Sequence, residues 1–256
     1  MKDVQNERDS RSIQIDRVGV RNVSYPVILL DHDNRTQSTI ASVSMSVMLP
    51  HEYRGTHMSR FIETLEEYHG RVSPSNLEAF TRRLCEKLNA PESSVSFTFP
   101  YYFRKHAPVS GIESFSKCDV TLQASWGKTF DMIITLGLNV QTLCPCSKEI
   151  SDNGAHNQRA LVELSVRSSG LLWFEEMIEM IEASASAPLY TLLKREDEKY
   201  ITELAYSRPR FVEDVLRELA VRLDAENRIL WYRVNVTSYE SIHGHDAFAE
   251  IERDKR

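Results

Sequence analysis

An alternation of small polar and apolar residues over positions 38–49 constrains the fold of this chain more than any other pattern. The stretch reads Ser-Thr-Ile-Ala-Ser-Val-Ser-Met-Ser-Val-Met-Leu and is followed by Pro50. Successive side chains of a β-strand point to opposite faces, so a period of two predicts a strand with one buried face. Similar stretches predict strands at about 94–104, 116–126, 129–140, 158–167 and, as the final strand, 228–239.

Four other segments have the apolar spacing of amphipathic helices. They lie at 62–68, closed by Gly70, at 75–88 with Ser75 as N-cap, at 171–183, and at 209–225 with Pro209 in its first turn. A turn at Trp126-Gly127-Lys128 predicts a hairpin between two of the strands. The order of elements predicts an α+β chain of two tandem modules, each an antiparallel sheet with paired helices on one face.

Composition and charge exclude several classes of protein. The chain has 256 residues, of which 41% are hydrophobic, enough for a sizeable core. Its net charge of -6 argues against a nucleic-acid partner, because phosphate binding usually requires a basic excess. No apolar run approaches the roughly 18 residues that span a bilayer, so we expect no membrane partner. Residues 1–13 are polar, lack the apolar region of a signal peptide, and predict a flexible tail on a cytoplasmic protein.

Two of the four cysteines stand out. Cys85 falls in a helical pattern and Cys118 in a predicted strand, so both are expected to be small buried hydrophobes. Cys144 and Cys146 instead flank a proline in a loop after a strand. Because a thiolate is both a nucleophile and a soft metal ligand, this loop is a candidate for chemistry.

His156 follows Cys144 by twelve residues and directly precedes the next predicted strand. A loop that returns to the sheet would bring the two side chains together. The spacing fits no structural zinc finger, since no second Cys-x-x-Cys and no His-x₃₋₅-His lies nearby. A mixed metal site with an open coordination position fits better, while a redox or structural role for the loop, and the role of Cys146, stay open.

A second cluster, Glu240-Ser-Ile-His-Gly-His245, lies beyond the last predicted strand. In an extended chain His243 and His245 point the same way, and a turn would let Glu240 join them. Metal binding or general-base chemistry therefore competes with a solvated loop.

Three charged segments have an ordinary explanation beside a functional one. Glu213 and Asp214 are favourable at a helix N-terminus through the helix dipole, and Glu198 lies in a charged run typical of a solvated surface. In Arg54-Gly-Thr-His-Met-Ser-Arg60, the backbone amides with Ser59 and Arg60 can hold an anion. The alternative is an N-cap at Thr56 or Ser59.

Together these segments closely resemble the signature of the type IB GTP cyclohydrolases. The resemblance rests on the Cys-Pro-Cys and Gly-Ala-His-Asn-Gln-Arg segments and on residues 54–61, 209–214 and 240–245, while residues 16–26 resemble the family's first strand. It implies the tunnelling fold, with modules at 14–126 and 127–256, the second carrying most active-site residues. It also implies assembly into an oligomeric barrel, a homotetramer with active sites at subunit interfaces.

The reaction implied by the resemblance is hydrolysis of GTP to 7,8-dihydroneopterin triphosphate and formate, the first step of tetrahydrofolate biosynthesis. Such an enzyme is a hydrolase acting on C–N bonds of cyclic amidines. The resemblance implies a divalent metal, Zn, Mn or Fe, near Cys144, His156, Glu198, Glu240 and His243. All of these except Glu198 are also expected to be catalytic.

For the substrate, Glu213 looks like the tunnelling-fold carboxylate that anchors guanine. A carboxylate can accept hydrogen bonds from N1–H and the exocyclic amine together. The triphosphate requires cations and hydrogen-bond donors, and the candidates are His57, Ser59, Arg60, Lys148 and Arg159, with Arg54 and Arg208 in addition.

Three competing hypotheses remain. A tunnelling-fold nitrile reductase acting on a deazaguanine would use a cysteine nucleophile and a nicotinamide, but the cluster of Glu240, His243 and His245 argues for metal-dependent hydrolysis. A non-catalytic zinc-binding or redox-sensing module would use Cys144 and Cys146. A variant hydrolase would release a cyclic phosphate, as archaeal relatives do.

Overall fold

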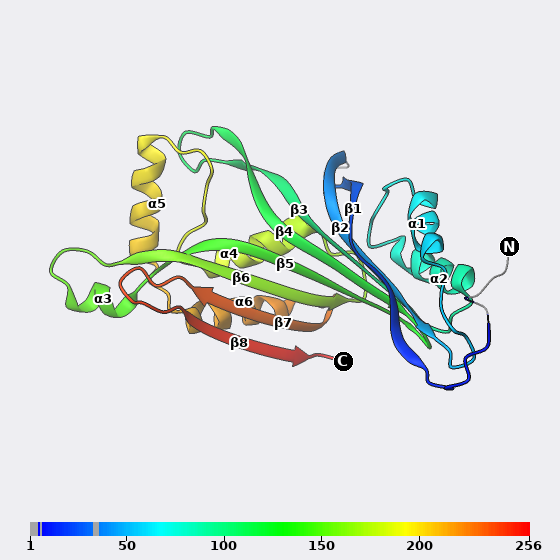
Figure 1. Cartoon of the computed structure of the whole chain (residues 1–256). Coiled ribbons are helices and arrows are strands. Elements are labelled where there is room, and N and C mark those ends of the chain that lie inside the picture. Colours follow the sequence, from blue (N-terminus) through cyan, green and yellow to red (C-terminus); the bar gives the residue numbers. More distant parts are fainter. Residues whose placement is uncertain (1–4, 6, 33–35) are drawn as a thin grey trace. The chain divides into compact units, whose positions relative to one another are not determined.

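The computed structural model of the chain describes residues 5, 7–32 and 36–256 (Figure 1). Within these residues it contains eight strands: β1 (Ile15–Leu30), β2 (Thr36–Leu49), β3 (Ser93–His106), β4 (Glu113–Trp126), β5 (Phe130–Leu143), β6 (Asn157–Ser168), β7 (Ile229–Ser238) and β8 (Ala247–Asp254). The helices are α1 (Met58–Glu67), α2 (Leu77–Leu88), α3 (Pro145–Ile150), α4 (Phe174–Ser184), α5 (Arg195–Ser207) and α6 (Val212–Ala225). Consecutive strands are hydrogen-bonded neighbours in one sheet, from β1 to β8.

Every segment predicted as a strand or helix forms that element, and the order strand, strand, helix, helix, strand, strand occurs twice when α3 and α5 are set aside. Two helix starts differ from the prediction: the N-cap of α2 is Asn76 and not Ser75, and α6 begins at Val212, after Pro209. This confirms the α+β class. The strand resembling the family's first strand is β1. The turn at 126–128 joins β4 to β5 as predicted. No helix in the described ranges is long and apolar enough to cross a bilayer.

Two differences from the sequence prediction have clear physical causes. The strand ending near Tyr239 is not the last, because β8 follows it and pairs with β7 in antiparallel register. Most β8 side chains are exposed and several are charged, so the strand lacks the buried apolar face that alternation reveals. Helix α5 begins in the charged run at 194–199, where its inward positions are Asp197, Ile201 and Ala205, and the carboxylate hides the helical apolar period.

The described residues form two compact units: unit 1 comprises residues 1–100 and 121–134, and unit 2 comprises residues 101–120 and 135–256. Strands β3, β4 and β5 each contribute residues to both units. The predicted modules at 14–126 and 127–256 follow the order of elements instead and stay a prediction. Residues 1–4 and 6 of the predicted flexible tail lie outside the described residues.

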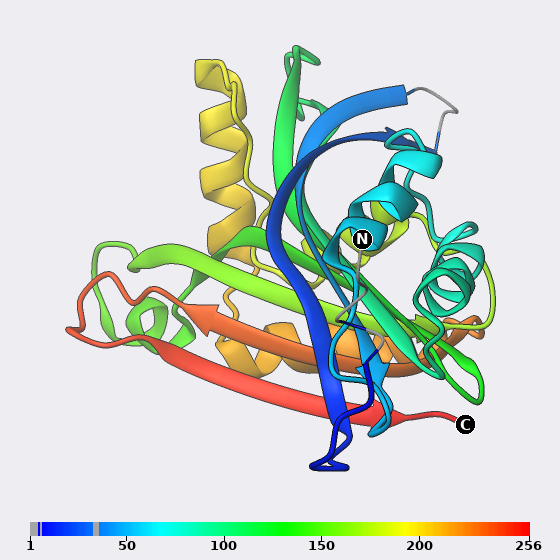
Figure 2. The same ribbon diagram turned by 45° about the vertical axis from the view of Figure 1, so that its right-hand side comes forward.

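In unit 1, α1 and α2 lie against one face of the β1–β2 pair, as the cyan helices beside the blue strands show (Figure 2). Alternate residues of β2, from Ala41 to Leu49, are buried, and Phe80 of α2 packs edge-on against Phe97 of β3 at 5.8 Å between ring centroids. The other face carries small hydroxyl side chains. Ser44 and Ser46 of β2 pair with Ser96 and Ser94 of β3.

Glycine is required at one point of this unit. A Cβ atom on Gly19 of β1 would lie 1.9 Å from the backbone oxygen of Met45. The two strands therefore approach so closely here that no side chain fits between them. The register of β1 against β2 shifts just after this point, between Val20 and Val23.

In unit 2, α4 and α6 cover one face of the strands from the carboxyl-terminal half of the chain. Val162 of β6 pairs with Val236 of β7, and both are fully buried. The buried residues of α6 include Val215, Leu219 and Leu223, spaced as an inward-facing helix stripe. Helix α6 packs against both α4 and β7.

One carboxylate of unit 2, that of Asp197, is fully buried. Asp197 is 0% exposed and accepts hydrogen bonds from the backbone N–H groups of Val109, Ser110 and Lys194, each at 2.9 Å, and from the Ser110 hydroxyl at 2.6 Å. Desolvation raises the pKa of Asp197, but these four donors outweigh it and hold the pKa below its usual range. The residue therefore fixes the start of α5 to the 109–110 turn.

Candidate active site

A cavity of about 400 Å³ in unit 2 collects most of the predicted site residues. Its walls include Cys144, His156, Glu213, Glu240 and His243, together with Cys146 and His245. We call it the Cys–His cavity. These side chains come from two loops and one helix start that are distant in sequence, so the tertiary structure brings them together.

The loop between β5 and β6 is closed by its backbone. Cys144 is the N-cap of α3, with Pro145 in the first helical position, where the missing N–H costs nothing. The Cys144 N–H donates to the backbone oxygen of His156 at 3.1 Å. The His156 N–H donates to the Ser147 hydroxyl at 2.8 Å, and the Ser147 N–H to the Cys144 Sγ at 3.4 Å. The predicted return of this loop, with Cys144 beside His156, is confirmed.

A hydrogen-bonded chain runs behind the His156 and Glu240 side chains. His156 Nδ1 lies 2.9 Å from Gln158 Oε1, and Gln158 Nε2 lies 3.4 Å from Glu240 Oε1. The Ser238 hydroxyl donates to the same Glu240 oxygen at 2.8 Å. Sequence reasoning did not single out Gln158 or Ser238. The available signal was that Gln158 lies two residues after His156 on a strand, and therefore on the same face.

His243 and His245 lie in the loop between β7 and β8. Their rings are stacked, with centroids 5.3 Å apart and an interplanar angle of 22°. Both side chains are exposed and both line the Cys–His cavity, although residues 241–245 form a bend and not the extended segment considered from the sequence.

The donor set of this cavity is chemically suited to a transition metal. A thiolate, imidazoles and a carboxylate are the ligands that Zn, Fe and Mn accept. Among the residues that the structure describes, no three Cys, His, Asp or Glu side chains converge on one point where an ion would be held. Glu198 is exposed on α5 and is not among the residues that line the cavity. The metal and its ligands therefore stay a prediction.

The start of α6 forms another wall. Glu213 lies in the first helical turn, and the aromatic side chain of Phe211 lines the cavity beside it. Arg210 also lines the cavity. Its backbone N–H donates to the backbone oxygen of Leu143 at 2.9 Å, and its guanidinium Nη1 lies 3.2 Å from Glu218 Oε1. Sequence reasoning listed Arg208 and missed Arg210, although Arg210 stands inside the quoted 209–214 segment.

The cationic residues predicted for the triphosphate in unit 2 lie outside the cavity walls. The Lys148 ammonium donates to Tyr206 O at 2.6 Å and lies 4.4 Å from the centre of the Tyr206 ring. Arg159 is exposed on β6, and Arg208 is the C-cap residue of α5. Their roles in substrate binding stay predictions.

The remaining candidates belong to unit 1. His57 is the N-cap of α1, so the helix begins between the two N-cap positions expected from the sequence, Thr56 and Ser59. Arg60 donates to Lys87 O at 2.9 Å, and Arg54 pairs with Glu7 at 2.9 Å. Ser59 is exposed in the first turn of α1.

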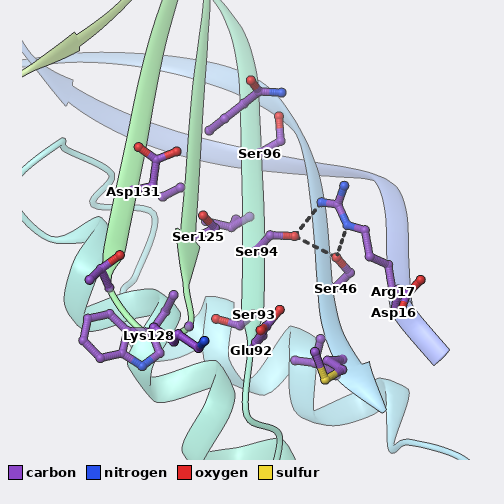
Figure 3. A pocket seen from close by; sticks show the side chains of 18 of the residues that line it. Asp16, Arg17, Ser46, Glu92, Ser93, Ser94, Ser96, Ser125, Lys128 and Asp131 are labelled. Carbon is purple, nitrogen blue, oxygen red and sulfur yellow. Dashed lines mark hydrogen bonds between the residues drawn. The ribbon is translucent and has the colours of Figure 1, made fainter. Parts of the chain in front are cut away.

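Unit 1 has a larger cavity, of about 530 Å³, on the face of its sheet that carries hydroxyl groups (Figure 3). Its walls include Ser46, Ser94, Ser96 and Ser125, and we call it the serine cavity. Arg17 donates to the Ser94 hydroxyl at 2.6 Å and to the Ser46 hydroxyl at 3.3 Å, and the two hydroxyls lie 2.8 Å apart. No predicted site residue lines this cavity.

Solved structures resemble this chain in fold. Uricase from Arthrobacter globiformis matches with a TM-score of 0.58 and 8% identity, covering 93% of both chains. Urate oxidase from Bacillus sp. TB-90 matches with a TM-score of 0.53 and 9% identity over 94% of this chain and 100% of that one. The likeness confirms the tunnelling fold and at this identity says nothing of function.

Curated relatives are much closer in sequence. GTP cyclohydrolase FolE2 of Kosmotoga olearia is 51% identical over 255 residues, covering 100% of this chain and 99% of that protein. GTP cyclohydrolase FolE2 of Fervidobacterium nodosum is 51% identical over 256 residues, covering 100% and 98%. The family model described as type I GTP cyclohydrolase folE2 matches residues 1–249. The chain therefore belongs to the type I GTP cyclohydrolase FolE2 family.

Proposed function

We propose that this chain is a type IB GTP cyclohydrolase that hydrolyses GTP to 7,8-dihydroneopterin triphosphate and formate in tetrahydrofolate biosynthesis. The observation that carries the proposal is the Cys–His cavity, in which Cys144, His156, Glu240 and His243 line one space with Glu213. The relatives named GTP cyclohydrolase FolE2 support the substrate and the reaction.

Glu213 gives the cavity a means of selecting guanine. Its carboxylate accepts hydrogen bonds from N1–H and the exocyclic amine, a pair that adenine does not offer. The neighbouring aromatic ring of Phe211 gives the base an apolar surface. Glu213 is exposed within an otherwise structured helix start, so it is available to a ligand.

Opening the imidazole ring of guanine requires addition of water at C8, followed by hydrolysis of the resulting formamide. A divalent ion, when bound, supplies Lewis acidity for both hydrolytic steps. Cys144 and His156 would hold it, with Glu240 and His243 and, by family resemblance, Glu198. His243 is proposed to carry protons between water and the ring nitrogens, because an imidazole can both accept and donate a proton.

Other parts of the proposal concern assembly and the triphosphate. We expect a cytoplasmic homotetramer with active sites at subunit interfaces, as the family resemblance implies. Lys148 and Arg159 of unit 2, and His57, Ser59 and Arg60 of unit 1, are the groups proposed for the triphosphate. A neighbouring subunit would supply some of them.

The decisive experiment compares Cys144→Ala with the control Cys85→Ala, which removes a half-buried thiol on α2 of unit 1. Formate release from GTP and the product mass are measured on Mn- or Zn-loaded protein, beside a thermal melt. We expect Cys144→Ala to keep its melting temperature within a few degrees and to lose activity by about 10²-fold or more. Cys85→Ala should retain activity. Mass spectrometry separates the linear triphosphate from a cyclic phosphate.

The same experiment separates the competing hypotheses. Absence of formate from metal-loaded wild-type protein would refute the cyclohydrolase reaction. Unfolding of Cys144→Ala, with no activity in the wild type, would favour a structural zinc or redox module. Oxidation of a reduced nicotinamide in the presence of a deazaguanine nitrile would favour the reductase.

A further inference from the structure

The hydrogen bonds of Gln158 determine which nitrogen of His156 carries a proton. Gln158 Nε2 faces Glu240 Oε1 at 3.4 Å, and Gln158 Oε1 faces His156 Nδ1 at 2.9 Å. A carboxylate only accepts hydrogen bonds, so the amide nitrogen must face Glu240. The amide oxygen then faces His156 and also only accepts. His156 Nδ1 must therefore carry the hydrogen, which the Ser241 hydroxyl at 3.4 Å from Nδ1 can also accept, and Nε2 keeps the free lone pair.

We propose that Gln158 is a positioning residue that holds His156 in its Nδ1–H tautomer and couples that tautomer to the carboxylate of Glu240. The proposal deepens the proposed function, because it gives a reason why His156 presents an unprotonated nitrogen to a metal ion. A ligating histidine commonly donates its other ring N–H to an oxygen acceptor, which fixes both the tautomer and the ring orientation.

The amide is held in this orientation from behind. Gln158 Nε2 also lies 3.3 Å from the Thr142 hydroxyl of β5, and the Ser238 hydroxyl of β7 donates to Glu240 Oε1 at 2.8 Å. Thr142 and Ser238 are each 1% exposed. The amide has a single favoured orientation, because turning it would set its oxygen against a carboxylate. Gln158 thus transmits the position of Glu240 to the imidazole of His156.

The test needs variants that remove one function of the amide at a time. Gln158→Met keeps the length of the side chain but offers no acceptor to His156. Gln158→Glu keeps the acceptor and loses the donor to Glu240. Thr142→Val is the matched control, because it removes the other partner of the amide nitrogen at constant volume and leaves the contact with His156 intact.

The primary measurement is the tautomer of His156 in metal-free, full-length protein. Long-range ¹H–¹⁵N spectra of histidine-labelled protein report it at a pH well above the ordinary histidine pKa of about 6.5. The His156 signal is identified by its loss in His156→Asn. We expect the Nδ1–H form in the wild type, in Thr142→Val and in Gln158→Glu, and a mixture of tautomers in Gln158→Met. The affinity for Mn or Zn, from chelator competition, should fall about 10- to 100-fold in Gln158→Met.

An Nε2–H tautomer in the wild type, or an unchanged tautomer and metal affinity in Gln158→Met, would overturn the proposal. If Gln158→Met does not fold, loss of the Nδ1–H form in folded Gln158→Glu still contradicts it. Neither measurement involves GTP. A wild-type protein that releases no formate but shows the expected tautomers would therefore refute the proposed function and leave the role of Gln158 standing.

Discussion

The serine cavity of unit 1 and the Cys–His cavity of unit 2 are both polar spaces on antiparallel strands, yet their polar groups are used in opposite ways. In the serine cavity, Arg17, Ser46 and Ser94 bond to one another. In the Cys–His cavity, Gln158 and Ser238 line the same space and bond to the side chains of His156 and Glu240. The number of polar residues in a cavity is therefore a poor guide to function. What distinguishes the candidate site is that the groups held in place are an imidazole and a carboxylate, which can act as bases and as metal ligands.

The comparison also explains why the larger cavity is not the candidate site. Hydroxyl–hydroxyl and hydroxyl–guanidinium hydrogen bonds contribute only about 0.5–1.5 kcal/mol each and carry no group that titrates near neutral pH. Cysteine, histidine and glutamate bring nucleophilic, basic and metal-binding atoms to the smaller cavity. The chemistry expected of the Cys–His cavity follows from its residue types and from the hydrogen bonds that hold them, and the volume of the cavity matters less.

The largest effect on kcat should come from replacing His243, the proposed proton carrier of unit 2, while the same replacement of a histidine in unit 1 should have none. His243→Asn is expected to lower kcat for GTP by about 10²- to 10⁴-fold, since this is the usual contribution of a positioned acid or base. His51→Asn changes an exposed histidine of unit 1 that lies 3.5 Å from Glu52 and should leave kcat unchanged. Steady-state formate release measures both. Equal losses in the two variants would break the distinction between the units.

A smaller effect should separate the serines of the two cavities. Ser238→Ala removes the 2.8 Å hydrogen bond to Glu240 and is expected to lower kcat/KM by about 10- to 100-fold, as loss of a supporting partner typically does. Ser94→Ala removes one bond from the serine cavity and should cost at most about 1 kcal/mol of stability, with kcat/KM retained. Kinetics and urea denaturation of both variants check this. A kinetic defect in Ser94→Ala alone would place the chemistry in the serine cavity and contradict the proposal.

The third prediction concerns stability and leaves the chemistry unaffected. The folded-state pKa of Asp197 is depressed, so its contribution to stability is present above the unfolded pKa of about 3.9 and is lost as the pH falls below that value. Asp197→Asn should therefore melt at a lower temperature than the wild type at pH 7. The difference should shrink as the pH falls from about 5 toward 2. Differential scanning calorimetry across this range is the measurement, and a constant difference would show that the carboxylate charge does not matter.

Much of the fold was predictable because alternation survives in the sequence wherever one face of a strand is buried. Residues 38–49 show this within β2, where every second side chain from Ala41 to Leu49 is buried. The sequence pattern did not predict elements whose buried positions are absent or polar. Strand β8 buries no side chain, and α5 places Asp197 where the helical period requires an apolar residue.

The candidate site was predictable in its residue types but not in its supporting contacts. Cys144, His156 and Glu240 stand out because few side chains have their chemistry, and the cavity does bring them together. Gln158 and Ser238 are chemically ordinary, and their importance depends on distances of a few ångströms between strands. Glu198 shows the opposite failure, since nothing in the described structure brings this predicted ligand to the cavity walls.

The backbone closure of the 144–156 loop separates the scaffold of the site from its reactive atoms. The bonds from Cys144 N to His156 O and from Lys148 N to Cys144 O do not involve the reactive side chains. One further bond, from the Ser147 N–H to the Cys144 Sγ at 3.4 Å, does use a reactive side chain, so a residue that replaces Cys144 must also accept this bond if the loop is to keep its conformation. For the proposed metal site, Cys144→Asp would exchange a sulfur ligand for an oxygen ligand while still accepting the Ser147 N–H, so the metal preference would change within the same backbone frame.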